Sequence, residues 1–184
     1  MMGRGAMSAL PIGYKAHLRA IADALRGVEP AVVQLVGMVR AARDAGRRLW
    51  ILGNGGSMAI AQHCAQDLLK CCAVRAQSTN DPSVLTAYAN DHAFEYAFYS
   101  PLLTLRDPDD PVLIFSCSGK SRNYTEFVSS PVHPLAVVVG TDGGFLKARA
   151  DVAVHVRSRD YQVCETAFQV VADLVVKALT PEEV

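Results

Sequence analysis

The chain has 184 residues, 51% of them apolar, and its 18 basic residues balance its 18 acidic residues to a formal net charge of zero. This length fits one compact domain better than two. Charged residues are scattered without long runs of one sign, which argues against a nucleic-acid-binding tail or a polybasic membrane surface.

Neither a membrane span nor a secretory signal is evident. The longest apolar runs, such as residues 134–139, fall far short of the roughly 20 residues that a membrane helix needs. We expect residues 1–13 to form a disordered or extended leader and residues 14–184 to form a single domain. The five cysteines are odd in number and lie mostly in apolar patterns, which suits reduced thiols. A soluble cytoplasmic protein is therefore expected.

The first half of the chain begins with helical patterns and then alternates strand-like and helical segments. Residues 14–26 and 30–45 repeat apolar residues at helical spacing, and the second of these is apolar enough to pack on both sides, within the domain or against another subunit. The segments expected after them are a buried strand over residues 48–53, a helix over 57–72, a weak strand over 75–80 and a helix over 83–99.

The second half repeats the alternation after a turn. DPDDP at residues 107–111 predicts a chain reversal. Strands are then expected over residues 112–117, 134–140 and 152–156, with helices over 121–128, 145–150 and 161–179. Strands that lack a clean polar alternation and are separated by helices indicate a parallel sheet covered on both faces. The fold class expected is therefore α/β, a three-layer doubly wound parallel sheet.

Two loops carry the small polar residues that bind ligands in such sheets. They are NGGS at residues 54–57 and SCSGKS at residues 116–121, each directly after an expected strand. Glycine allows close backbone approach, while free amides and serine hydroxyls supply donors for phosphate oxygens. Taken alone, either loop also fits an ordinary strand-to-helix turn, and neither matches a dinucleotide or nucleoside-triphosphate fingerprint. Their pairing favours a phosphate-containing ligand.

Four motifs in register then resemble a known family. GNGGS followed by AQH, LTAYANDHAFEYAF, SCSGKS and VVVGTDGG are similar in order and spacing to the sugar isomerase (SIS) domain family, in its phosphoheptose isomerase branch. The resemblance covers roughly residues 31–179. It implies a flavodoxin-like domain with N-terminal helices, assembled as a homotetramer, that binds a phosphosugar such as sedoheptulose 7-phosphate in pockets shared between subunits.

The resemblance also implies roles for residues of both loops. Three serines of the second loop would hold the phosphate, with Cys117 standing where the family usually has threonine. The first loop would meet the sugar, and Asp91 would approach the sugar hydroxyls. For Asn90 and Asp91 the alternative is a turn that interrupts a helix. The substrate-binding residues implied are Asn54, Gly55, Gly56, Ser57, Asp91, Ser116, Cys117, Ser118 and Ser121.

The zinc ligands that the resemblance implies are only partly present. His63 matches the family's first ligand and Asp67 stands in place of a glutamate, four residues later and so on the same helical face. The alternative is a solvated or core-satisfied histidine beside an exposed acid. On the last expected helix, Cys164 and Glu165 align with a glutamine and a glutamate, and Ala172 stands where a second histidine belongs.

Two interpretations of the altered helix remain open. A thiolate is a better zinc ligand than an amide, so His63, Asp67 and Cys164 would form a three-ligand site with one open position. Zinc would then polarise the sugar carbonyl, and Glu165, or a group that the sequence does not identify, would move the proton between adjacent carbons through an enediol, with His63 and Asp67 completing the catalytic set. The alternative is that Cys164 is a small buried apolar residue.

Three hypotheses for function follow. The leading one is an aldose–ketose isomerase acting on sedoheptulose 7-phosphate or a related phosphosugar. The second is a noncatalytic phosphosugar-sensing or protein-binding module, because the same family includes a bacterial replication-initiator-associating protein. The three retained serines favour a protein that still binds a phosphosugar. The third is a heteromeric assembly in which a related subunit supplies the missing histidine.

Overall fold

A five-stranded parallel sheet forms the centre of the protein. The computed structural model describes residues 13–79 and 81–181, so most of the expected leader lies outside the described residues. The strands lie in the order β2-β1-β3-β4-β5, which is the flavodoxin-like order. Their bounds are β1 (Arg48–Gly53), β2 (Arg75–Ser78), β3 (Val112–Ser116), β4 (Leu135–Val139) and β5 (Val152–His155).

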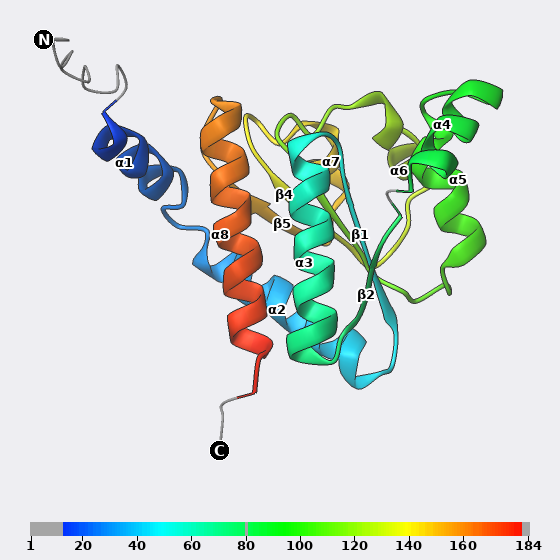
Figure 1. Cartoon of the computed structure of the whole chain (residues 1–184), viewed down its shortest axis with the longest axis horizontal. Helices are drawn as coiled ribbons and strands as arrows, with labels where there is room; N and C mark the ends of the chain where they lie inside the picture. Colours follow the sequence, from blue (N-terminus) through cyan, green and yellow to red (C-terminus); the bar gives the residue numbers. More distant parts are fainter. Residues whose placement is uncertain (1–12, 80, 182–184) are drawn as a thin grey trace, which may run out of the picture.

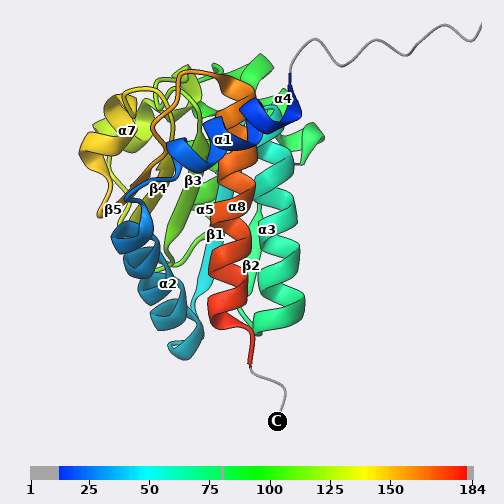
Figure 2. The same ribbon diagram turned by 90° about the vertical axis from the view of Figure 1, so that its left-hand side faces the viewer.

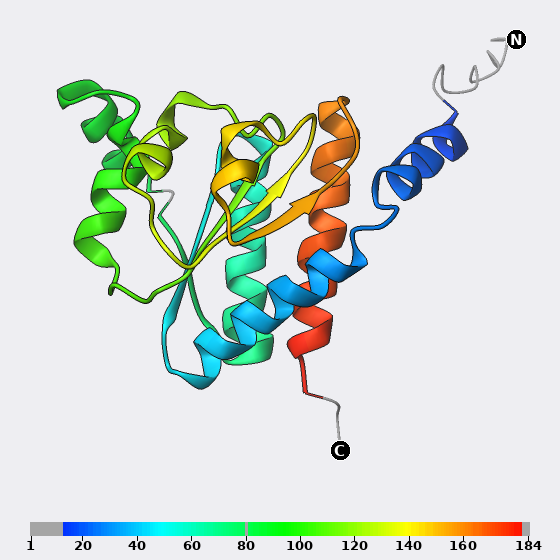
Figure 3. The same cartoon turned by 180° about the vertical axis from the view of Figure 1, so that it is seen from behind.

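Helices cover both faces of this sheet, which confirms the expected three-layer α/β architecture. One layer holds α1 (Tyr14–Ala24), α2 (Glu29–Asp44), α3 (Gly56–Cys72) and α8 (Tyr161–Leu179). The other holds α4 (Pro82–Asp91), α5 (Tyr96–Leu105), the 3-10 turn η1 (Arg122–Tyr124), α6 (Glu126–Ser129) and α7 (Gly144–Arg149). Figure 1 shows α3 and α8 side by side against the sheet, and Figure 3 shows the opposite side. Within residues 13–79 and 81–181, no helix has the length and apolar character to cross a bilayer.

The side chains of β1 show why the sheet needs both layers. Leu49 and Ile51 pack into the layer of α2, α3 and α8, while Trp50 and Leu52 pack into the layer of α5 and α6. All four are fully buried. A strand buried on both faces has apolar residues on both. This is why the sequence of β1 shows no alternation of polar and apolar residues.

Helix α2 buries one side and leaves the other open. Val32, Leu35, Val36, Val39 and Ala42 face the core, whereas Val33 is 64% exposed. Figure 2 shows α2, α8 and α3 across the same layer, with α1 over the end of α8. An apolar groove of about 680 Å³ lies between α2 and α8, and its apolar lining includes Leu25, Val28, Val32, Val33, Val36, Leu174 and Ala178. Within one chain, α2 therefore packs on one side only.

The helix expected over residues 83–99 is interrupted, and this expectation was wrong. Helix α4 ends at Asp91, His92 leaves the helical conformation (φ −118°, ψ −93°), and α5 begins at Tyr96. The break falls directly after Asn90 and Asp91, as the alternative of a helix-interrupting turn predicted. It lets α5 bury apolar side chains in the core, whereas α4 has no buried residue. The helix expected over residues 121–128 is likewise divided, into η1 and α6.

A buried carboxylate, that of Asp110, lies at the end of the sheet opposite the loops that follow β1 and β3. Asp110 is 1% exposed and accepts hydrogen bonds from the backbone amide of Arg48 (2.9 Å), the indole of Trp50 (3.1 Å) and the amide of Asp107 (3.1 Å). These bonds join the turn before β3 to the start of β1. Burial raises the pKa of the Asp110 carboxyl, but the hydrogen bonds from the amides outweigh this and lower the pKa below its usual range.

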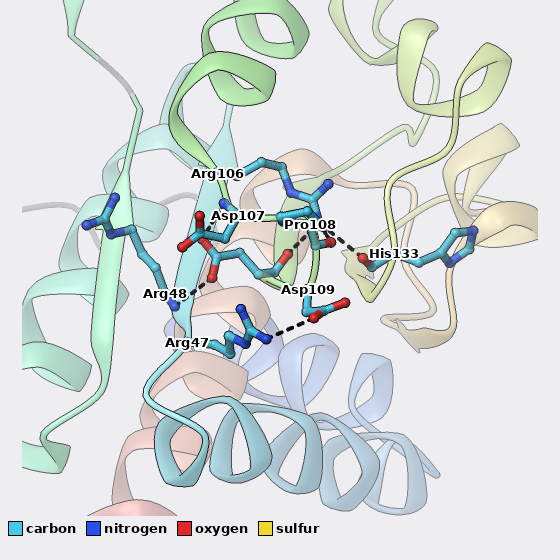
Figure 4. A network of polar contacts seen from close by, with 8 residues as sticks. Arg47, Arg48, Arg106, Asp107, Pro108, Asp109 and His133 are labelled. Atoms are coloured by element: carbon cyan, nitrogen blue, oxygen red, sulfur yellow. Dashed lines mark hydrogen bonds and ion pairs between the residues drawn. The ribbon is translucent and has the colours of Figure 1, made fainter.

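The guanidinium of Arg106 ties the same turn to the start of β4. It donates to the carbonyl oxygens of Pro108 (2.6 Å), Asp110 (2.9 Å) and His133 (3.1 Å), as Figure 4 shows. The expected chain reversal at residues 107–111 is thus confirmed, and it fixes the relative positions of three strands.

Replacing the buried carboxylate should cost stability. We expect Asp110→Ala to lower the free energy of unfolding by about 3 kcal/mol, because it leaves buried donors without an acceptor. Urea unfolding at neutral pH measures this. Since the pKa of Asp110 is lowered on folding, the difference from wild type should be full above about pH 4 and shrink as the pH falls further.

The matched control is Asp109→Ala in the same turn. Asp109 forms an exposed ion pair with Arg47 (2.9 Å), which should contribute less than about 1 kcal/mol. Equal losses in the two variants would contradict the structural role given to Asp110.

Candidate active site

The two small polar loops meet at the carboxyl ends of β1 and β3. These strands are neighbours in the sheet, but β1 leads into α3 on one face and β3 leads into η1 and α6 on the other. Such a switch point opens a crevice. A pocket of about 70 Å³ lies there, and it is lined by Asn54, Ser57, Phe115, Ser116, Cys117, Ser118, Ser121, Tyr161 and Glu165.

The last helix closes this pocket with a carboxylate. Glu165, in the second turn of α8, accepts a hydrogen bond from the hydroxyl of the buried Ser57 at 3.4 Å. A Cβ added to Gly56 would lie 2.3 Å from the carboxylate oxygen of Glu165, so the glycine is what allows this close approach. A negative charge at the first turn of α3 is also favoured by the helix dipole.

The second loop presents hydroxyl groups to the pocket. The hydroxyl oxygen of Ser116 accepts from the amide of Gly119, and that of Ser118 accepts from the amide of Lys120, both at 3.1 Å. A hydroxyl that accepts in this way keeps its proton for another acceptor. The amides of Gly119 and Lys120 are therefore occupied by hydrogen bonds within the loop. The serine hydroxyls remain as donors for a ligand.

The same loop is shaped by a glycine contact with the next turn. Gly119 has a φ of +63°, and a Cβ there would lie 2.0 Å from the carbonyl oxygen of Gly143. A side chain at this position would displace the turn between β4 and α7. The backbone conformation of the pocket wall thus requires a glycine at this position of SCSGKS.

Cations beside the second loop already have partners. Lys120 pairs with Asp142 at 2.7 Å, and Arg122 donates to Glu95 at 2.8 Å. Hydrogen bonds from Lys120 and Arg122 lower the pKa of the Asp142 and Glu95 carboxyls respectively. The charge of each cation is therefore offset at the pocket rim, and neutral hydroxyls make up the second-loop wall.

Cys164 is buried and hydrogen-bonded to the backbone near the end of β4. Its thiol is 1% exposed and donates to the carbonyl oxygen of Ser158 at 3.3 Å. A Cβ added to Gly140 would lie 2.5 Å from its sulfur, so the side chain packs at the end of β4. A hydrogen bond with Cys164, burial and the nearby Glu165 carboxylate raise the pKa of the Cys117 thiol. Cys164 behaves here as the small buried residue of the alternative interpretation.

His63 and Asp67 form a pair on α3, outside the pocket. The Nε2 of His63 lies 3.1 Å from the Oδ2 of Asp67, and the two side chains are 53% and 27% exposed. No group of three His, Cys, Asp or Glu side chains suited to a metal ion occurs among residues 13–79 and 81–181. Within one chain, His63, Asp67 and Cys164 therefore do not fit a three-ligand zinc site.

Of the other residues that the family resemblance implies, those of the first loop lie at the pocket and Asp91 does not. Asn54 and Ser57 line the pocket from the first loop, and Gly55 precedes the first turn of α3 with a φ of +55°. Asp91 does not line this pocket; it is exposed at the end of α4 and accepts a hydrogen bond from Asn90 at 2.8 Å. The contact of Asp91 with a sugar stays a prediction.

Three residues of the site were missed from the sequence, and one of them, Phe115, lines the pocket from the end of β3. Tyr161 lines the pocket four residues before Glu165, and this helical spacing was a usable signal. Asn123 is buried and exchanges two hydrogen bonds with Asn54. Nothing in the local sequence pointed to this pair, because its members lie 69 residues apart.

Comparison with known proteins then assigns the family. The phosphoheptose isomerase of Geobacter metallireducens is 33% identical over 178 residues, which cover 90% of this chain and 94% of that protein. The chain belongs to the phosphoheptose isomerase family. The resemblance to the sugar isomerase family found in the four motifs is thereby confirmed. No protein-family model matches the chain.

Solved structures agree with this family and fold. A phosphoheptose isomerase from Neisseria gonorrhoeae superposes with a TM-score of 0.82 at 25% identity, over 90% of this chain and 94% of that one. The Vibrio vulnificus NanR protein complexed with ManNAc-6P superposes with a TM-score of 0.61 at 12% identity, over 90% of this chain and 61% of that one. The second likeness shows the shared fold.

The position of Cys164 leads to a prediction about metal content. After incubation with zinc and removal of the excess, Cys164→Ala should retain the same amount of zinc per chain as wild type, because its sulfur is directed toward Ser158. Elemental analysis measures this, with circular dichroism to check that the variant is folded. A loss of bound zinc in folded Cys164→Ala would restore Cys164 as a ligand.

Proposed function

We propose that this protein is an aldose–ketose isomerase that acts on sedoheptulose 7-phosphate or a closely related phosphosugar. The observation that carries the proposal is that a carboxylate and three serine hydroxyls share one pocket at the switch point of the sheet. Membership of the phosphoheptose isomerase family supports it, as does the ManNAc-6P complex of a protein with the same fold.

The second loop binds the phosphate in this proposal. Ser116, Ser118 and Ser121 offer hydroxyl donors, and hydrogen bonds to a charged group are stronger than those between neutral groups. The pocket of about 70 Å³ has room for a group of only a few heavy atoms, since one water takes about 30 Å³. The sugar would therefore extend from the second loop toward Tyr161 and Glu165, which line the same pocket.

Glu165 is the general base of this proposal. Its carboxylate lines the pocket from α8. It takes the proton from the carbon next to the sugar carbonyl, which gives an enediolate. The hydroxyl proton passes to the former carbonyl oxygen, and Glu165 returns its proton to the former carbonyl carbon, which moves the carbonyl by one position. Ser57, which donates to Oε1, holds the carboxylate in place. Zinc stays a prediction that rests on His63 and Asp67.

Turnover tests the function directly. We expect the wild-type protein to convert sedoheptulose 7-phosphate to the corresponding aldose phosphate. Glu165→Gln should lower kcat by about 10²- to 10⁴-fold, because the amide cannot accept the proton, while KM changes little. Steady-state assay of the aldose product measures both constants.

Glu126→Gln, on α6 and outside the pocket, is the matched control and should keep wild-type kinetics. A wild-type protein that binds phosphosugars but turns none of a panel over would overturn the enzyme proposal. A Glu165→Gln variant with wild-type kcat would remove Glu165 as the base.

The noncatalytic alternative is less well supported. The curated relative reported above is a phosphoheptose isomerase, and the phosphate-binding serines line the pocket together. We also propose that the protein works in the cytoplasm, where its five free cysteines would stay reduced.

We further propose that the protein assembles as a homotetramer. The groove between α2 and α8 is apolar, and Val33 and Leu174 beside it are 64% and 44% exposed. An apolar groove flanked by exposed apolar side chains is a surface that a second chain could cover. A second copy of the chain is the partner that the family resemblance implies.

Light scattering tests the assembly. The wild-type protein should have about four times the chain mass of 19.8 kDa, and Val33→Glu should lower the mass by placing a charge in the interface. Leu103→Glu, at a 48% exposed position on α5, is the control and should keep the wild-type mass. A wild-type monomer would contradict the proposal.

A further inference from the structure

Asn123 supports the pocket from behind its wall. It lies in η1, two residues after Ser121, and its side chain is 1% exposed. Its carboxamide and that of Asn54 exchange two hydrogen bonds: Nδ2 of Asn54 donates to Oδ1 of Asn123 at 2.9 Å, and Nδ2 of Asn123 donates to Oδ1 of Asn54 at 2.8 Å. Asn54 lines the pocket, and Asn123 does not.

This reciprocal pairing holds the two carboxamides in contact and couples their orientations, so that Asn54 cannot turn alone without losing both hydrogen bonds. A carboxamide has two N–H donors and an oxygen with two lone pairs, and the pair uses one donor and one lone pair of each residue. If Asn54 rotated by half a turn, its NH₂ group would meet the NH₂ group of Asn123 and the two oxygens would face each other. One N–H and one lone pair of Asn54 are therefore left for other partners.

We propose that Asn123 is a positioning residue, which orients the carboxamide of Asn54 toward the sugar of the bound phosphosugar. The inference rests on the proposed function. It assigns Asn54 to the sugar rather than to the phosphate, because Asn54 comes from the first loop, whereas Ser116, Ser118 and Ser121 belong to the second. Asn123 acts only through Asn54.

Asn123→Leu removes the pairing and keeps a similar side-chain volume. We expect it to lower kcat/KM for sedoheptulose 7-phosphate by about 10- to 100-fold, since a misoriented contact near the reacting carbons is costly. The affinity for inorganic phosphate, measured by calorimetry, should stay within about twofold of wild type, because the second-loop serines are intact. Gln77→Leu, at an exposed carboxamide on β2, is the control for loss of an amide group.

Asn123→Asp separates positioning from a purely structural role. A protonated aspartic acid has one O–H donor and one carbonyl acceptor, so it can replace the reciprocal pair, whereas the ionised form only accepts and faces the oxygen of Asn54. Burial favours the protonated form. The kcat/KM of Asn123→Asp relative to wild type should therefore rise as the pH falls from 8 to 5, while the relative value for Asn123→Leu stays constant.

The charged groups near Asn123 are common to all variants. Arg122 is paired with Glu95, and Glu165 lines the same pocket as Asn54, so these groups are present in wild type and in every variant. Asn123→Leu with wild-type kcat/KM would overturn the inference, as would an Asn123→Asp ratio that does not change with pH. If Asn123→Leu lost as much affinity for inorganic phosphate as it loses in kcat/KM, Asn123 would support the second loop. That result would also overturn the inference.

Failure of the proposed function would be seen separately. It would appear as a wild-type protein without turnover. In that case the affinities of the same variants for sedoheptulose 7-phosphate, measured by calorimetry, would still show whether Asn123 orients Asn54.

Discussion

The contact between Glu165 and the first turn of α3 is the interaction on which the site depends. It brings the last helix of the chain against a loop 108 residues earlier, and it requires a glycine at position 56. Without this contact, the loops after β1 and β3 would form an open crevice lined only by neutral groups. With it, the crevice has a carboxylate beside the serine hydroxyls of the second loop. The strand order places the two loops next to each other, and α8 contributes the carboxylate of Glu165.

The neutrality of the second-loop wall has a chemical consequence. Lys120 and Arg122 are each paired with a carboxylate, so the phosphate would be held by hydroxyl donors without a free cation among the lining residues. Such donors are directional, and they fix the position of a phosphosugar more than they add to its electrostatic attraction. Positioning of this kind suits an isomerase, because the proton must move between two particular carbons.

Much of this organisation was predictable because it is periodic. The bounds of β1 and of α8 agree with the apolar runs and the helical spacing in the sequence, and the DPDDP turn was recognisable from its composition. The break after Asp91 was not predicted as the main interpretation, because apolar residues continue at helical spacing on both sides of it. The direction of Cys164 was also hidden, since α8 is buried on several sides and spacing alone does not select one. The pairing of Asn54 with Asn123 is a long-range contact, which no local pattern encodes.

A crystal structure with sedoheptulose 7-phosphate bound would test the central assignment most directly. The phosphate should lie within hydrogen-bonding distance of the hydroxyls of Ser116, Ser118 and Ser121, with the first two carbons of the sugar next to the Glu165 carboxylate. A phosphate bound away from the second loop, or a sugar carbonyl out of reach of Glu165, would contradict the assignment.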